Sequence, residues 1–309
     1  MGIYSDPRGV LYEPHTGNVV ELGTTQVEDY IFPAWLYNKI VYIEKKGLWP
    51  VLQDARLAER YDMAIVAGEG YATEASRMLF AQASRQQQYQ LFVLHDADPD
   101  GYNIARTLRE ETERLPGYAV DIADIGLTME DANARGLERE TFSRNKALPS
   151  TLVLTDAARK AFTGRQTGPK SWIGERVELN AFSSPDLIAY IEEGLQRAGA
   201  SGKVIPPEQV LKNEARRIAE DRLTSMATGA FSRLLQSDEL VHQVVRQFQG
   251  NFGITDAHGL VEGQLQTRPT ASWDRVLRTE VETLVSPHYE AIEEAMRAAL
   301  QAAIQTLKL

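Results

Sequence analysis

Three aspartates at alternate positions form the most chemically suggestive pattern in this sequence. Asp96, Asp98 and Asp100 follow the apolar run Leu91 to Leu94, and Gly101 and a helical pattern come directly after them. Alternate residues of an extended segment point the same way, so the carboxylates of Asp96 and Asp98 can face one spot. Two carboxylates in one place repel each other unless a cation or protons lie between them.

Three interpretations of this pattern are open. The spacing D-x-D-x-D-G matches the start of an EF-hand calcium loop, but Thr107 stands where the bidentate Glu should be, and the lead-in is strand-like. Asp, Pro and Gly are also ordinary turn residues, and Asp can cap the next helix, so a purely structural turn is the second interpretation. The third is a magnesium site, which requires a further carboxylate from a neighbouring strand.

A further carboxylate is available upstream, at Glu44. It ends the short apolar run that begins at Lys39, and a third strand-like run, Met63 to Ala67, enters a glycine-rich turn and a helix. Three strand–helix units in about 70 residues predict a parallel sheet with right-handed crossovers. Open α/β sheets bind ligands at the carboxyl ends of their strands. We therefore expect Glu44 and the aspartates to share one edge of the sheet.

Together these motifs resemble a Toprim domain, and more narrowly the variety in the A subunit of topoisomerase VI and its meiotic double-strand-break relatives. The resemblance rests on Glu44 at a strand end, on GYATEASR in the turn and helix that begin at Gly70, and on DADPDG at 96–101. It covers roughly residues 9–118 and is most specific from Glu44 to Gly101. In that family a winged-helix domain with the DNA-attacking tyrosine lies upstream, and we expect this sequence to lack it, so no nucleophile is assigned.

The resemblance implies magnesium-dependent chemistry on DNA, with Mn²⁺ as a substitute. The implied metal ligands are four carboxylates: Glu44, Asp96, Asp98 and, for a second ion, Asp100. The first three are the implied catalytic residues, and Glu44 is also an implied general acid or base. Two ions about 3.5–4 Å apart can stabilise the attacking and leaving oxygens of a phosphodiester. Lys45 and Lys46 are candidate phosphate contacts.

Three functional hypotheses remain open. The first is Mg²⁺-dependent cleavage of DNA phosphodiesters, either partner-assisted or by a nuclease that uses water. The second is a topoisomerase subunit whose tyrosine lies on another chain. The third is a non-catalytic DNA-binding scaffold in a maintenance or defence complex. The resemblance also implies a homodimer and an ATPase partner of the topoisomerase VI B type.

Basic residues gather in one stretch of the sequence, between residues 159 and 176. This stretch holds five basic residues against one acid, and we interpret it as a loop punctuated by Gly and Pro. Its candidate DNA contacts are Arg159, Lys160, Arg165 and Lys170, against the alternative of an ordinary solvated loop. The run GRQTGPKS within it is not a phosphate-binding P-loop, because Pro169 stands where the second Gly must be. We therefore expect no ATP site here.

Three other side chains have a candidate role. Tyr71 and Arg77, in the glycine-rich turn and its helix, are candidate DNA contacts, with a solvent-side position as the alternative. His95 abuts the aspartates, but magnesium prefers oxygen ligands, so a packing or hydrogen-bonding role is favoured.

Composition limits the class of protein. The 309 residues are 43% hydrophobic and 25% charged, as in a soluble globular protein. The net charge of −10 argues against a protein that coats nucleic acid by charge alone, although a local basic patch is enough for a DNA enzyme. There is no cysteine, so disulfides and thiolate metal sites are excluded. No apolar run approaches the ~20 residues that span a bilayer, and no signal peptide is evident, so we expect no membrane association and a cytoplasmic location.

The expected fold is α/β, with a Toprim-like parallel sheet flanked by helices. Four parts are predicted: an N-terminal β-hairpin flap (1–38), the Toprim core (39–126), a Toprim extension with the basic loop (127–205) and a mostly helical C-terminal region (206–309). A fourth strand of the core is predicted at Tyr118 to Ile122, after Pro116-Gly117.

Overall fold

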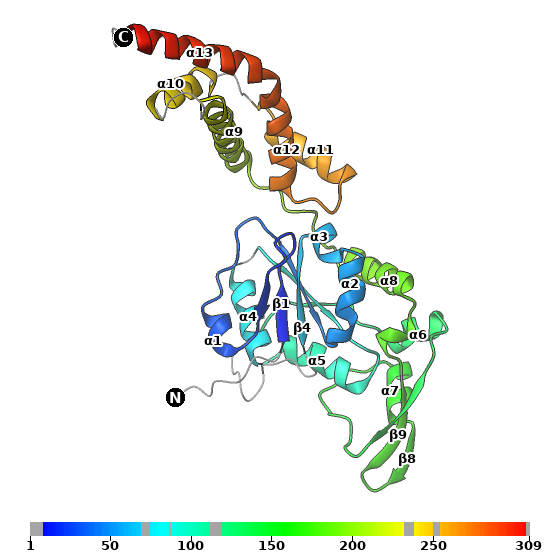
Figure 1. The fold of residues 1–309 in the computed structure, drawn as a ribbon. Helices are drawn as coiled ribbons and strands as arrows, with labels where there is room; N and C mark the ends of the chain where they lie inside the picture. The colour runs from blue at the N-terminus through cyan, green and yellow to red at the C-terminus, as the bar shows by residue number, and fades with distance from the viewer. Residues whose placement is uncertain are drawn as a thin grey trace. The chain divides into compact units, whose positions relative to one another are not determined.

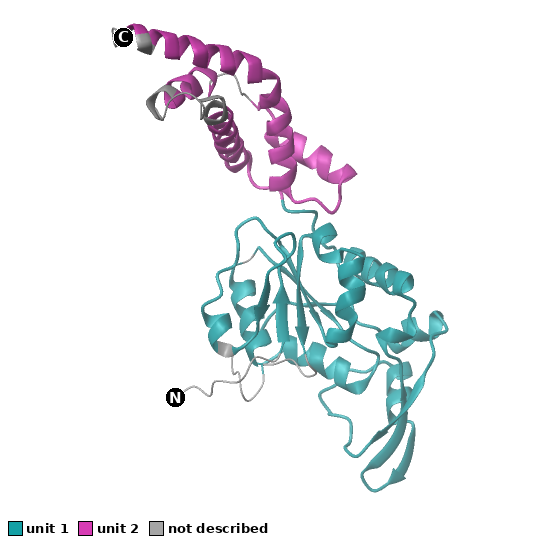
Figure 2. Cartoon of the chain, in the orientation of Figure 1, with its two compact units in different colours: residues 1–204 teal, residues 205–309 magenta. Residues whose placement is uncertain are grey.

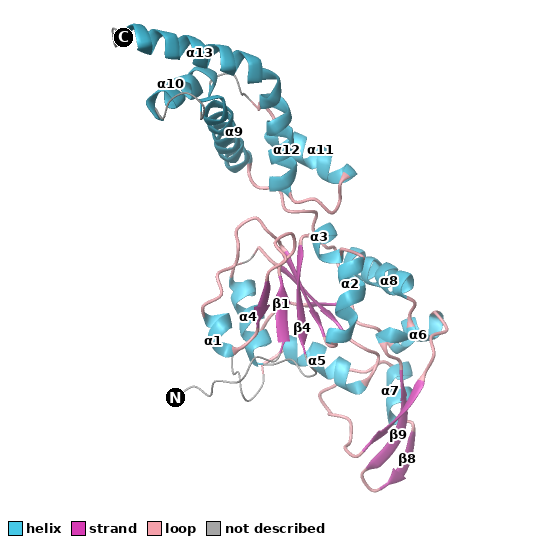
Figure 3. Cartoon of the chain, in the orientation of Figure 1, coloured by secondary structure: helices cyan, strands magenta, loops and turns pink. Residues whose placement is uncertain are grey.

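The computed structural model describes residues 9–68, 74–86, 88–111, 119–231, 238–249 and 254–306. The chain divides into two compact units, residues 1–204 and 205–309 (Figure 2). The first combines strands and helices, and the second is helical, so the predicted α/β fold with a helical C-terminal region is confirmed (Figure 3). Within the described ranges, no helix is both long enough and apolar enough to cross a membrane.

A six-stranded sheet forms the centre of the first unit. Its strands lie in the order β2-β1-β4-β3-β5-β6, and β4, β3, β5 and β6 are parallel. Their bounds are β1 Gly9–Tyr12, β2 Val19–Glu21, β3 Lys39–Ile43, β4 Met63–Gly68, β5 Gln90–Leu94 and β6 Ala123–Asp124. Every residue of β3 and β4 is buried, which is why these strands read as continuous apolar runs in the sequence.

Helices cover both faces of this sheet (Figure 1). Alternate residues of β3 enter different cores: Val41 and Ile43 face one, and Ile40 and Tyr42 face the other, as the two-residue period of a strand requires. The first core is closed by α2 Trp49–Asp54, α3 Leu57–Tyr61, α6 Met129–Ala134, α7 Asp156–Thr163 and α8 Ser184–Arg197. The second is closed by α1 Thr24–Glu28, α4 Glu74–Arg85 and α5 Pro99–Arg109.

Two strand predictions near the ends of the sheet have different outcomes. The N-terminal hairpin is confirmed, and β1 also pairs antiparallel with β4, so the hairpin extends the main sheet. The fourth strand is wrong as predicted, because the observed β6 is Ala123–Asp124; Tyr118 itself lies outside the described residues. The backbone before β6 bonds to the end of α5 instead. The Val120 N–H donates to the Arg109 carbonyl at 3.1 Å, and the Arg109 guanidinium donates to the Ile122 carbonyl at 2.9 Å.

The basic stretch is not a loop, which corrects the prediction for residues 159–176. It is the end of α7 followed by an antiparallel hairpin, β8 Arg165–Gly168 and β9 Ser171–Arg176, and β9 also pairs with β7 Glu140–Arg144. We call α7, β8 and β9 the basic arm; its hairpin projects from the main sheet (Figure 1). The edge strand β8 is exposed and polar, so it lacks the apolar alternation that marks a half-buried strand. A Cβ on Gly174 would lie 2.8 Å from the Phe162 carbonyl oxygen, so only glycine lets β9 pack on α7 this closely.

The second unit has its own apolar core. It is built from α9 Glu208–Phe231, α10 Asp238–Gln249, α11 Ala257–Thr267, α12 Trp273–Val285 and α13 Tyr289–Thr306, with a short 3₁₀ turn, η3 Ser286–His288, between the last two.

Candidate functional site

The ends of β3 and β5 bring the predicted acids together. The two strands are parallel neighbours with Ile43 opposite Leu94, so the residues that follow them leave the sheet at the same edge. We call Glu44, Asp96 and Asp98 the carboxylate edge. Burial raises the pKa of Glu44 to about 7, and the charges of Asp98 and then Asp96 add to the rise. The parallel register of β3 and β5 therefore places these carboxylates at one edge of the sheet, as the sequence predicts.

One carboxylate oxygen of Glu44, Oε2, is buried without a hydrogen bond to the described residues. A buried polar atom normally has a partner, and a charged one costs still more free energy to leave bare. The site therefore has an unfilled requirement for a donor or a cation at Glu44.

One oxygen of Asp98 caps a helix, and its other oxygen has only a distant partner among the described residues. Its Oδ1 caps α5 by accepting the Gly101 N–H at 2.7 Å, as the turn interpretation predicts. Its Oδ2 lies 3.9 Å from the Arg176 guanidinium. Burial raises the pKa of Asp98, although the Gly101 N–H acts in the opposite direction. A Cβ on Gly101 would lie 2.5 Å from the Asp96 carbonyl oxygen, so the tight turn requires glycine there.

Asp96 is held by one hydrogen bond and one ion pair, and its Oδ2 has the ion pair with Lys45 but no hydrogen bond of good geometry among the described residues. Its side chain is 1% exposed, its Oδ1 accepts the Leu179 N–H at 2.7 Å, and its Oδ2 lies 2.7 Å from the Lys45 ammonium. The same ammonium lies 2.7 Å from Glu178 Oε2, and the other oxygen of Glu178 lies 2.8 Å from Arg176. Leu179 belongs to a short 3₁₀ turn, Leu179–Ala181.

Sequence reasoning missed Glu178 and the pairing role of Arg176. An isolated antiparallel bridge between Ala97 and Val177, with N···O distances of 2.9 and 3.1 Å, joins the segment after β5 to the segment after β9. The antiparallel register sets Glu178 opposite Asp96. The alternation R-V-E at 176–178 mirrors D-A-D at 96–98, but nothing in the sequence indicates that the two segments meet.

The buried His95 stabilises the turn that follows β5 through hydrogen bonds. It is buried, its Nδ1 lies 2.7 Å from the Asp96 carbonyl oxygen, and its Nε2 lies 3.1 Å from Asp124 Oδ1. Burial alone would lower the pKa of His95, but the hydrogen bond to Asp124 and its charge raise that pKa above its usual value. The predicted hydrogen-bonding role is confirmed.

The predicted set of four metal ligands is not assembled in the described part of the chain. Across the described residues, no three His, Asp or Glu side chains are arranged to hold a metal. Both oxygens of Asp96 are engaged, and Asp100 is exposed in the first turn of α5. Glu44, with its bare oxygen, and Asp98 remain, and Mg²⁺ characteristically takes one or two carboxylates plus waters and phosphate oxygens. The four-ligand assignment stays a prediction.

The candidate DNA contacts are spread over several elements. Lys46 is exposed in the 3₁₀ turn Lys46–Leu48, whereas Tyr71 lies outside the described residues. Arg77 is 6% exposed and donates to the Glu110 carbonyl at 2.8 Å, so it holds the end of α5. This burial does not favour a DNA contact at Arg77, and that contact stays a prediction.

The four candidates of the basic arm are exposed: Arg159 and Lys160 on α7, Arg165 on β8 and Lys170 in the turn before β9.

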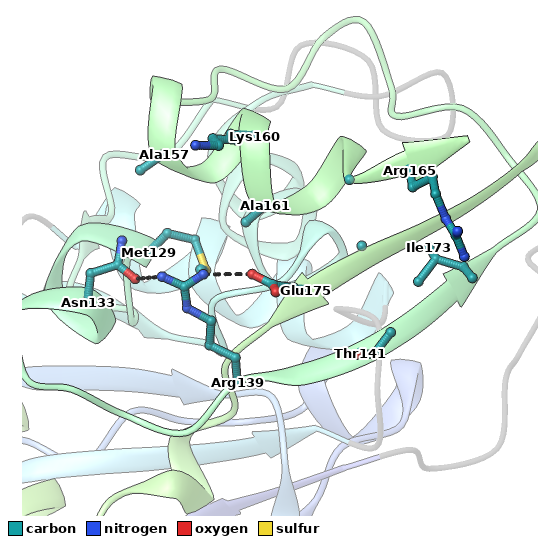
Figure 4. A pocket seen from close by; sticks show the side chains of 12 residues that line it. Met129, Asn133, Arg139, Thr141, Ala157, Lys160, Ala161, Arg165, Ile173 and Glu175 are labelled. Carbon is teal, nitrogen blue, oxygen red and sulfur yellow. Dashed lines mark hydrogen bonds and ion pairs between the residues drawn. The ribbon is translucent and has the colours of Figure 1, made fainter. Parts of the chain in front are cut away.

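Lys160 and Arg165 line one pocket between α6, α7 and the three-stranded sheet β7-β9-β8 (Figure 4). Its volume is about 610 Å³, and Met129 and Ala161 contribute apolar side chains to its lining. Arg139, which the sequence analysis did not single out, also lines it and lies 2.7 Å from Glu175. Three cations against one carboxylate make this the candidate anion-binding surface of the arm.

Comparison with known proteins identifies the domain that carries the site. Residues 39–186 match the family model for the Toprim domain of the topoisomerase 6 A subunit and Spo11. The A subunits of type 2 DNA topoisomerase 6 from Pyrococcus horikoshii and Pyrococcus abyssi are each 23% identical to this chain over 237 residues. Each alignment covers 67% of this chain and 62% of the relative, so the chain spans less than two thirds of the relatives' length. Residues 39–186 are therefore a Toprim domain of the type found in topoisomerase 6 A subunits and Spo11, as the sequence motifs predict.

Proposed function

We propose that this chain carries out Mg²⁺-dependent cleavage of DNA phosphodiesters, in a partner-assisted or nuclease-type reaction. The observation that carries the proposal is the buried Oε2 of Glu44, which has no hydrogen-bond partner in the described part of the chain and lies at the ligand-binding edge of a Toprim sheet with two further carboxylates.

Glu44 and Asp98 would hold the ion, and Mn²⁺ can substitute for Mg²⁺. A bound ion would supply charge stabilisation for the oxygens of the phosphodiester. Asp96 positions the edge through Lys45 and Leu179, and the exposed Asp100 is the candidate ligand for any second ion. Without a bound ion the pKa of Glu44 is about 7, so Glu44 could accept or donate a proton near neutral pH, as a general acid or base does; a cation bound to it would favour its ionised form.

The proposed DNA contacts are basic side chains on the surface. Lys160 and Arg165 in the arm pocket have the chemistry to bind backbone phosphates, and Arg159, Lys170 and Lys46 are further contacts. Such contacts position a duplex without reading its sequence. They also allow a chain of net charge −10 to approach DNA through one local patch.

Two other functions each have an observation in their favour. The names of the two relatives favour a topoisomerase component, which would act as a homodimer, with an ATPase of the topoisomerase VI B type and a tyrosine from another chain. The engagement of both Asp96 oxygens by protein groups favours a non-catalytic DNA-binding scaffold. Action on DNA inside the cell, in the cytoplasm, is common to all three.

Cleavage of supercoiled plasmid separates these functions. The protein is incubated with plasmid and Mg²⁺ or Mn²⁺, and the products are run on a gel with and without protease. Metal-dependent nicking that is lost in Glu44→Gln and Asp98→Asn, and kept in Glu290→Gln, supports hydrolysis by this chain. Glu290 is an exposed glutamate of α13, so its variant controls for the loss of one carboxylate.

The other outcomes have distinct meanings. DNA that enters the gel only after protease treatment indicates a covalent tyrosine link, as the topoisomerase hypothesis requires. DNA binding without cleavage under either metal contradicts the stand-alone nuclease. It leaves the scaffold and the partner-dependent topoisomerase component, which adding a candidate ATPase then distinguishes.

A further inference from the structure

Lys45 lies where the carboxylate cluster needs a cation. Its ammonium nitrogen is 2.7 Å from Asp96 Oδ2 and 2.7 Å from Glu178 Oε2. The side chains of Asp96 and Glu178 are only 1% and 12% exposed. Carboxylates that have lost this much solvent require a compensating charge, and Lys45 supplies it to both at once.

The strand register explains why a cation is needed at this position. Through the Ala97–Val177 bridge, Asp96 lies opposite Glu178, and like charges directly opposite each other across a strand pair are destabilising. The next pair along, Asp98 opposite Arg176, joins opposite charges and needs no third group. The Lys45 ammonium forms an ion pair with both Asp96 and Glu178 and so offsets the repulsion between them.

Two neighbouring residues of opposite charge, Glu44 and Lys45, follow the end of β3. Glu44 brings a buried carboxylate oxygen that lacks a hydrogen-bond partner among the described residues, and Lys45 brings an ammonium that is fully engaged. We propose that the Lys45 ammonium takes the place of a second divalent ion between Asp96 and Glu178, so that the site binds a single ion. The inference rests on the proposed function for the position of that single ion, at Glu44 and Asp98.

Removing the ammonium should convert the pair into a metal site. Without Lys45, Asp96 Oδ2 and Glu178 Oε2 would face each other without the ammonium between them, and Arg176 would remain only on the other oxygen of Glu178, at 2.8 Å. Oxygen ligands of this kind suit Mg²⁺ and Mn²⁺. The change is specific to position 45, because Arg176, which lies 2.8 Å from Glu178 Oε1 and 3.9 Å from Asp98 Oδ2, keeps its charge when Lys45 is replaced.

The experiment counts Mn²⁺ ions bound by the full-length chain without DNA, by isothermal titration calorimetry and by metal analysis after equilibrium dialysis. We expect one ion in the unchanged protein, two in Lys45→Met and one in Lys45→Arg, which keeps the positive charge. Lys45→Met/Glu178→Gln should return to one ion, because one carboxylate of the new site is gone. Lys146→Met, at an exposed lysine, controls for the lost charge and should bind one.

The gain on removing Lys45 tests this inference, and the count in the unchanged protein tests the proposed function. A protein that binds no ion, with one gained in Lys45→Met, supports the inference and contradicts the proposed first site. Two ions in the unchanged protein, or no gain in folded Lys45→Met, overturns the inference. If Lys45→Met melts early without metal, recovery of its melting temperature with Mn²⁺ supports the inference, and failure to recover contradicts it.

Discussion

The carboxylate edge and the basic arm balance their charges in opposite ways. At the edge, buried acids are neutralised inside the protein, Asp96 by Lys45 and Asp98 in part by Arg176. On the arm, Lys160 and Arg165 are exposed and face solvent around an open pocket. Buried charges cost stability unless they are paired, whereas solvated charges cost little. Changes at the edge should therefore alter both stability and chemistry, and changes on the arm should alter binding alone.

The largest effect on stability should come from Asp96→Ala. It leaves the Leu179 N–H without its acceptor and takes from Lys45 one of its two carboxylate partners, at a cost of about 1–3 kcal/mol in free energy of unfolding. Urea denaturation followed by circular dichroism measures it. A loss below about 1 kcal/mol would contradict the view that the edge is a tightly compensated buried network.

Glu44→Gln should have the next largest effect on the free energy of unfolding. This substitution should stabilise the protein, and the gain should depend on pH. The folded-state pKa of Glu44 is raised from 4.5 to about 7, so its neutral form adds stability that is fully present below pH 4.5 and is lost as the pH rises through 7. In metal-free protein at pH 8, Glu44→Gln should therefore gain about 1–2 kcal/mol, and much less at pH 5.

The same variant tests the metal proposal. Mg²⁺ should raise the melting temperature of the unchanged protein at pH 8 and have little effect on Glu44→Gln. An equal rise in both proteins would mean that the ion binds elsewhere.

On the arm, Lys160→Ala and Arg165→Ala should weaken DNA binding and leave the melting temperature unchanged. Each lost phosphate contact should reduce the slope of log affinity against log salt by about 1. Fluorescence anisotropy with a labelled duplex at several salt concentrations measures this slope. Arg268→Ala, at an exposed arginine outside the arm, is the matched control. An unchanged slope in both arm variants would remove the pocket from the proposed DNA surface.

The smallest effect should come from Asp100→Asn. Asp100 is exposed at the start of α5, and exposed substitutions of this kind stay within about 0.5 kcal/mol. The Mn²⁺ affinity of the Asp100→Asn protein, measured by titration calorimetry, should differ less than about threefold from that of the unchanged protein. A tenfold loss would restore Asp100 as a ligand and would argue for a second ion at this edge.

Local sequence patterns predicted the framework of the site correctly. The apolar runs before Glu44 and Asp96 became buried parallel strands, and the D-x-D-P-x-G pattern became a capped turn into α5. These features depend on short-range signals: strand burial, Asp at a helix cap and Pro in the first helical turn. The prediction that the basic stretch is a loop was wrong, because the exposed edge strand β8 has no alternation of apolar and polar residues that would indicate a strand.

The sequence by itself determined that Glu44 lies at the same edge as Asp96 and Asp98, because parallel strands with adjacent ends leave their following residues at one edge. Only the tertiary structure decided how those acids are balanced. The bridge between Ala97 and Val177 brings Glu178 and Arg176 to the aspartates across some 80 residues of chain, and packing turns Arg77 inward. Charge compensation depends on which side chains lie within a few ångströms in a low-dielectric interior, and spacing along the sequence does not encode that distance.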